Sequence, residues 1–152
     1  GLHDAQPGPP ATVPQGRIMN RLQQAHWLGR GSLAFMFAYH GLVPKLIDIS
    51  PGERLLLQAH GLEQAAWLSQ AAGVAELLLA AVLLLAPGLQ WPLLLAAAIL
   101  LGLLVDVAVM QPSMLVDAFN PVTLNVAGMA LCAVAWITRP DKRVNTQLKE
   151  MT

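Results

Sequence analysis

Four long apolar stretches alternate along the chain with shorter polar or Pro/Gly-rich connections. They cover about residues 27–46, 64–86, 91–111 and 121–138. A helix that crosses a bilayer needs about 20 mainly apolar residues, so each stretch is long enough to be a span. The second and third stretches are joined by the short turn PGLQWP, which is typical of an antiparallel hairpin. The pattern predicts an all-α integral membrane protein built as an antiparallel bundle of four transmembrane helices.

Basic residues gather at the two ends of these four stretches. Arg17 and Arg21 precede the first, and the last is followed by Arg139, Lys142, Arg143 and Lys149. The first outer loop carries only Lys45 and Arg54, and the third connection carries no basic residue. Because cytoplasmic loops hold the excess of Lys and Arg, we expect both termini to be cytoplasmic.

Two shorter segments on the outer side carry helix-capping signals. In SPGERLLLQAHG, Ser50 is a predicted N-cap and Glu53 completes a capping box. Pro51 suits the first helical position, and Gly61 is a stop signal. In QPSMLVDAFNPVT, a turn of helix precedes the last span, which Asn120 is expected to cap. We therefore expect short interfacial helices that roof the outer side of the bundle.

Composition supports a membrane protein of one domain. The 152 residues are 55% hydrophobic and 12% charged, whereas an ordinary soluble domain is about 25% charged. Net charge is zero and no basic patch with interleaved aromatics is present, which excludes nucleic acid as a partner. We expect residues 1–20 to be a disordered or processed tail, 21–140 the four-helix membrane domain, and 141–152 a basic cytoplasmic tail.

Each predicted span places one polar side chain in its outer half, and ionisable groups in a bilayer are costly enough to mark candidate sites. Ser69 and Gly73 share a helix face with Glu76, and Gly102 shares one with Asp106. Since small residues let helices pack closely, we expect both acids to point inward, toward a common cavity. The candidate ligand-binding residues are His40, Lys45, Glu76, Asp106, Asn120 and Asn125. Catalytic residues are left unassigned.

The stretch YHGLVPKL supplies much of this predicted site. Pro44 has no N–H, so the carbonyl of His40 loses its helical partner, and Gly41 lets another helix approach closely. Some of these polar residues also have a purely structural interpretation. Lys45 equally suits an interface marker, Asn120 a helix cap, and Arg30 a side chain that extends to the cytoplasmic headgroups.

Cofactor signals are weak in this sequence. Haem would need paired axial ligands, but His26 and His40 lie on the same predicted helix and no other span supplies a His. A lone Cys132 excludes an internal disulfide, a CxxC pair and a thiolate zinc site. No GxGxxG is present, and we expect no metal and no cofactor bound covalently or by a motif.

Taken together, YHGLVPKL, SPGERLLL, AGVAELLLA and FNPVTLNVA resemble the DoxX-like family of small four-helix bacterial membrane proteins. The resemblance covers about residues 25–138. The family pattern falls on His40, Gly41, Pro44, Lys45, Glu76, Asn120 and Pro121. It implies a multi-pass protein of the bacterial cytoplasmic (inner) membrane.

The resemblance also implies a redox context. The wider DoxX family includes a membrane subunit of a thiosulfate:quinone oxidoreductase and membrane partners of thiol and superoxide defence enzymes. The chain is therefore expected to be a membrane subunit or adaptor of a quinone-linked or stress-related redox system. A quinone is then the candidate ligand, and a soluble or membrane oxidoreductase is the candidate partner. Two alternatives remain: a binding or transport module for a small hydrophobic or weakly acidic ligand, and a membrane enzyme that uses Glu76 and Asp106 as an acid pair. Homo-oligomerisation is left open.

Overall fold

The computed structural model describes residues 15–140, and every regular element in that part of the chain is helical. The tails at 1–14 and 141–152 lie outside the described residues. The elements in chain order are α1 (Gln15–Gly41), a π-helical segment (Leu42–Ile47), α2 (Pro51–Ala59), α3 (Ala66–Leu85), α4 (Trp91–Met110), a 3-10 turn (Pro112–Val116) and α5 (Pro121–Ile137). Because α1 begins at Gln15, the part of the predicted N-terminal tail from 15 to 20 is helical instead.

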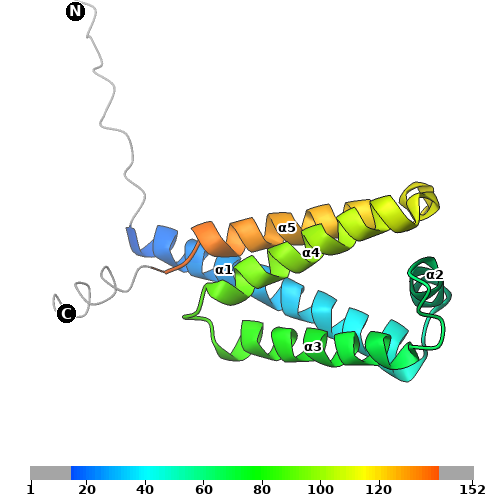
Figure 1. Ribbon diagram of the computed structural model, residues 1–152. Coiled ribbons are helices and arrows are strands. Elements are labelled where there is room, and N and C mark those ends of the chain that lie inside the picture. Colours follow the sequence, from blue (N-terminus) through cyan, green and yellow to red (C-terminus); the bar gives the residue numbers. More distant parts are fainter. Residues whose placement is uncertain (1–14, 141–152) are drawn as a thin grey trace, which may run out of the picture.

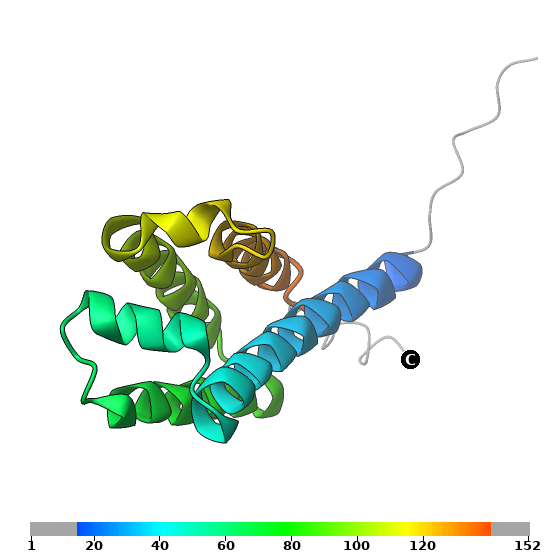
Figure 2. The ribbon, with the colours of Figure 1, turned by 90° about the vertical axis from the view of Figure 1, so that its right-hand side faces the viewer.

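Four long helices form the body of the protein, and two short elements cover one end of it. Helix α1 packs against α3 and α5, and α4 packs against α5. Figure 1 shows that α3 and α4 run in opposite directions, as predicted, but diverge from the turn that joins them. Seen along the helices, α2 lies across the side between α3 and α4, and the 3-10 turn lies across α4 and α5 (Figure 2). The predicted roof of short helices is therefore present at this end.

Two of the four predicted spans meet the length and hydropathy that a membrane crossing requires, namely α3 and α4. Helix α5 is apolar but has 17 residues, and the polar first half of α1 carries Arg17 and Arg21. Large apolar side chains such as Leu78, Leu85 and Val109 are exposed on α3 and α4. Broad apolar exposure of this kind suits helices that face lipid better than helices that face water.

The core of the bundle is densely apolar on the side away from the roof. Leu33 and Phe37 of α1 are buried there against Leu83 of α3 and Ala96 of α4. His26 of α1 is also buried, and its Nδ1 lies 2.7 Å from the carbonyl oxygen of Ala135 on α5, so that its imidazole ties the two helices.

Arg30 holds the C-terminal end of α3. Its guanidinium is fully buried and donates to the carbonyl oxygens of Leu83 at 2.8 Å, Ala86 at 3.0 Å and Leu89 at 3.0 Å. A helix end leaves carbonyls without intrahelical partners, and a cation is favourable beside them. The expectation that Arg30 reaches the cytoplasmic headgroups is wrong, because each of its three side-chain nitrogens donates to one of these carbonyls within the fold.

Candidate functional site

A glycine-to-glycine crossing of α1 and α3 sets the geometry of the site. A Cβ atom added at Gly41 would lie 2.5 Å from the carbonyl oxygen of Gly73, and one added at Gly73 would lie 2.6 Å from the carbonyl oxygen of Gly41. Neither position accepts a larger residue without a shift of backbone. The close approach predicted for Gly41 is therefore present, and it brings the residues that follow it against α3.

Lys45 follows in the π-helical segment, where Pro44 supplies no N–H for the usual α-helical bond. The lysine is buried, and its ammonium donates to Oε1 of Glu76 at 2.5 Å. Glu76 is also buried, on the face of α3 that includes Gly73. Lys45 therefore neutralises the acid of α3 instead of marking the membrane interface.

A second carboxylate reaches the same ammonium from α2. Oε1 of Glu53 lies 3.7 Å from Nζ of Lys45, and Oε2 of Glu53 accepts a hydrogen bond from Ser69 Oγ at 2.8 Å. The predicted capping box is only half formed. Ser50 Oγ accepts from the Glu53 N–H at 3.3 Å, but the Ser50 N–H donates to the carbonyl of Pro44, which frees the Glu53 side chain for the site.

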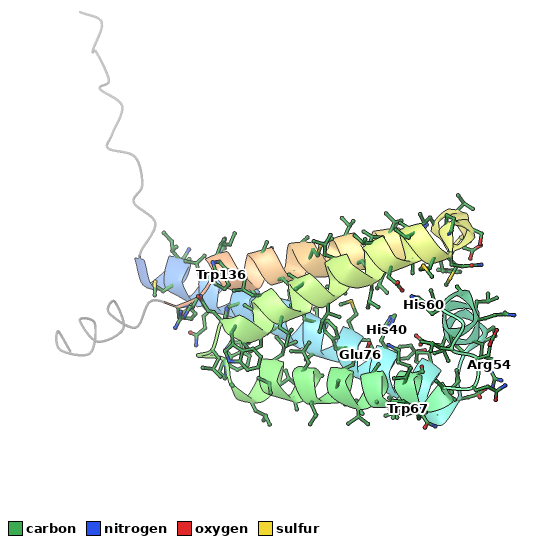
Figure 3. The ribbon with its side chains drawn as sticks, viewed as in Figure 1. His40, Arg54, His60, Trp67, Glu76 and Trp136 are labelled. Carbon is green, nitrogen blue, oxygen red and sulfur yellow. The ribbon has the colours of Figure 1, made fainter. Side chains whose placement is uncertain are left out.

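A small cavity opens beside Glu76 in the middle of the bundle, and all four long helices line it. Figure 3 shows the side chains of His40 and Glu76 on the inner side of the helices, in the space between α3 and α4. The lining residues are Met36, Phe37 and His40 of α1, Glu76 of α3, Leu100 and Leu103 of α4, and Leu124 and Asn125 of α5. Its volume of about 30 Å³ is room for about two water molecules, whereas pockets for drug-sized ligands measure about 300–1,000 Å³.

The polar groups that face this cavity are incompletely paired. Oε2 of Glu76 is fully buried and has no hydrogen-bond partner among residues 15–140. Asn125 is buried and His40 half-buried at the same cavity. A buried carboxylate oxygen without a partner is costly, so it is a group that a water molecule, a proton or a small donor would satisfy.

Asp106 does not line this cavity, so the predicted inward pair of acids is not formed. Its Oδ1 lies 2.9 Å from His60 Nε2, at the end of α2, and both side chains are about one-third exposed. Gly102, on the same face of α4, has open space around it. The buried face of α4 carries larger residues, among them Leu93 and Leu100. The alternative of an enzyme with an acid pair loses its geometric basis.

His60 is held by acceptors on both of its ring nitrogens. Nδ1 lies 2.7 Å from the Leu56 carbonyl oxygen, and Nε2 contacts the carboxylate of Asp106. Neither acceptor can donate, so the imidazole satisfies both only when it is protonated. The Leu56 carbonyl and then the Asp106 carboxylate raise the pKa of His60 above its ordinary value.

Asn120 is a helix cap in the structure. Its side chain accepts from the N–H of Thr123 at 3.1 Å and donates to the carbonyl of Asp117 at 3.1 Å, as the N-cap of α5. These bonds hold its side chain at the start of α5, and Asn120 does not line the cavity. Of the six candidates, the structure brings His40, Lys45, Glu76 and Asn125 together and separates Asp106 and Asn120.

Two residues of the charged cluster were missed from the sequence. Glu53 was assigned wholly to a local cap, so its reach to Lys45 was not foreseen. Ser69 was placed on the face of Glu76 only as a small packing residue, so its hydrogen bond to Glu53 was not foreseen. Within the described residues, no group of three or more His, Cys, Asp or Glu side chains is arranged to hold a metal ion.

Comparison with known proteins agrees with this architecture. The family model described as the DoxX-like family matches residues 34–133, which include the crossing, the charged cluster and the cavity. No curated protein and no solved structure matches the chain. The match covers most of the chain, and two of the matched helices are long and apolar enough to cross a bilayer. The chain is a membrane protein that belongs to the DoxX-like family.

Proposed function

We propose that this protein is a four-span subunit of the bacterial inner membrane that serves a quinone-linked or stress-related redox system by exchanging a proton at Glu76. Its termini are cytoplasmic and its roof, which includes α2, faces the outer solution. The distribution of Lys and Arg supports this orientation. The apolar half of α1 with its π-helical extension, and the apolar α5, supply the other two spans beside α3 and α4.

The observation that carries the proposal is the unpaired oxygen of Glu76 at a water-sized cavity. The cluster around it holds two carboxylates, of Glu53 and Glu76, and one ammonium, of Lys45. One negative charge is left over in a region of low dielectric, where an uncompensated charge is costly. Uptake of one proton, on Glu76 or on the neighbouring His40, removes that excess.

Proton exchange also gives the redox association a chemical reason. Reduction of a quinone consumes two protons with two electrons, and a membrane subunit that holds a proton can support that step. The cavity has room for water but not for a quinone ring. This cavity therefore does not hold the quinone, which we assign, with the electron-transferring groups, to the partner oxidoreductase or to the bilayer around it.

Infrared difference spectroscopy on the purified protein tests the proton site. Across a pH titration, we expect the wild type to show the carbonyl stretch of a protonated carboxyl group and Glu76→Gln to lack it. Asp48→Asn, which removes an exposed acid of the outer loop, is the matched control and should keep the band. A band that persists in Glu76→Gln would reject Glu76 as the proton site.

Cysteine labelling tests the orientation in a Cys132→Ala background. Asp48→Cys should react with an impermeant maleimide in intact cells, and Lys142→Cys should react only after permeabilisation. The opposite result would invert the topology. Redox association is tested by gene deletion: oxidoreductase activity of the membranes should fall, and Glu76→Gln should restore the protein level but not the activity.

A further inference from the structure

Glu53 extends the charged cluster from Glu76 toward the outer surface. Its side chain is 23% exposed, whereas those of Lys45 and Glu76 are 7% and 9% exposed. Lys45 therefore lies between a carboxylate that water reaches and one that water barely reaches. Ser69 donates to the Glu53 oxygen that does not face the lysine, and so directs the other oxygen toward the ammonium.

We propose that Glu53 takes a proton from the outer solution and passes it through Lys45 to Glu76. This inference rests on the proposed function, because it gives the route and the side of access for the proton that Glu76 exchanges. The ammonium is at hydrogen-bond distance from Glu76 and at 3.7 Å from Glu53. A movement of about 1 Å by the flexible lysine side chain brings it to bonding distance from Glu53.

The transfer balances as two linked steps. An N–H bond of the Lys45 ammonium breaks while an O–H bond forms on Glu76, which leaves a neutral amine beside a neutral carboxyl group. Glu53, protonated from outer water, then loses its O–H proton to the amine and becomes a carboxylate again. The net change is one proton moved from the outer solution to Glu76, with Lys45 restored as an ammonium.

Access from the opposite side is closed by the fold. Beyond the cavity lies the apolar core around Leu33 and Leu83, both fully buried. Past that layer lies Arg30, a positive charge held by hydrogen bonds from its three side-chain nitrogens to carbonyls at the end of α3 and in the turn that follows. A proton would have to cross a dry layer and pass a cation to leave by this route, so the site exchanges with the outer side alone.

The titratable groups that act on Glu76 come from α1, the π-helical segment and α2. They are His40, which lies within reach of the Glu76 charge, and Lys45 and Glu53. Helices α4 and α5 contribute only uncharged side chains to the cavity, including Asn125. Within the described residues, Glu53 is thus the acid through which outer water reaches this group of charges.

A pH jump followed by time-resolved infrared spectroscopy tests the relay in right-side-out membrane vesicles. We expect Glu53→Gln to slow protonation of Glu76 about tenfold or more, because a proton donor is lost, and to lower its final extent, because the excess negative charge of the cluster is lost as well. Ser69→Ala keeps both carboxylates and should slow the rate less, and it carries the test if Glu53→Gln fails to fold. Asp48→Asn is the control for an outer acid outside the cluster and should leave the rate unchanged.

The outcomes separate the relay from the function on which it rests. A wild type with no titrating Glu76 band would reject the proton site itself. A normal band with the same rate in wild type, Glu53→Gln and Ser69→Ala would reject only the relay. The proposal requires Glu76 to be protonated more slowly after a pH jump in inside-out vesicles than in right-side-out vesicles. Equal protonation rates in the two kinds of vesicle would overturn the access from one side.

Discussion

Replacement of Arg30 by methionine tests whether this residue, buried toward the end of the fold away from the roof, is a major support of the bundle. Arg30→Met keeps a long side chain but removes the three donors that bind the end of α3. A hydrogen bond from a charged donor contributes about 1.5–3 kcal/mol, which gives a simple sum of about 4.5–9 kcal/mol. The net effect is smaller than this sum, because burial costs the arginine its hydration and some of the freed carbonyls would bind water. We therefore expect Arg30→Met to lower the free energy of unfolding by about 3–5 kcal/mol.

Cys132 provides the assay, because it is the single cysteine of the chain and is buried. Its rate of labelling in mild detergent, as a function of added denaturant, reports unfolding of the bundle. Arg139→Met is the matched control: among residues 15–140, its exposed guanidinium donates only to the Gly88 carbonyl in the turn between α3 and α4, at 3.2 Å, and its loss should cost under about 1 kcal/mol. Equal stability of the two variants would refute the role given to Arg30.

Two further predictions concern other contacts of the fold. Gly73→Ala should lower the unfolding free energy by about 2 kcal/mol or more, because its Cβ would meet the Gly41 carbonyl oxygen at 2.6 Å, whereas Gly102→Ala, in open space, should be neutral in the same labelling assay. NMR titration should give His60 a raised pKa, and Asp106→Asn should bring it only part of the way back, because the Leu56 carbonyl, the larger cause, remains. Because folding raises the pKa of His60, its contacts stabilise the folded protein fully when the pH is below the ordinary histidine pKa. That stabilisation is lost as the pH rises through the raised pKa. A His60 pKa that is the same in both proteins would contradict the contact.

Helix positions in this protein follow closely from the sequence. The predicted stretch 64–86 contains α3 at Ala66–Leu85, and 91–111 contains α4 at Trp91–Met110. These ends are marked by Pro and Gly, and long apolar runs leave little else for the backbone to form in lipid. The start of α1 was missed because a helix can continue as a polar element past the membrane surface, where hydropathy no longer marks it.

Helix rotation was much harder to predict, and Asp106 shows the reason. In lipid, the outward face of a helix is as apolar as its packed face, so hydropathy does not identify which face is inward. Small residues on the face of Glu76 gave the right rotation for α3, because Gly73 makes the closest contact with α1. The same rule failed for α4, where a Cβ added at Gly102 would point into open space and larger residues pack inward. Partners from distant elements, such as Glu53 for Lys45, depend on the placement of α2 and so were missed as well.

The distance between α3 and α4 offers a way to distinguish the proposed proton exchange from the alternative function, the binding of a small ligand. These two helices diverge from their turn, and α2 bridges them through Glu53 on one side and His60 on the other. A ligand larger than water needs the cavity to widen, and we expect that widening to separate α2 from α4 at the contact between His60 and Asp106. Proton transfer through Lys45 needs no such release.

A short bifunctional maleimide can join cysteines placed by His60→Cys and Asp106→Cys, in a Cys132→Ala background. This crosslink should hold α2 in place and leave the infrared band of Glu76 and its rate of protonation unchanged. The single variants treated with the same reagent control for loss of the native contact. If the membranes keep their redox activity after the crosslink, the result fits the proton role. If activity is lost only in the crosslinked protein, a larger molecule must pass between α3 and α4.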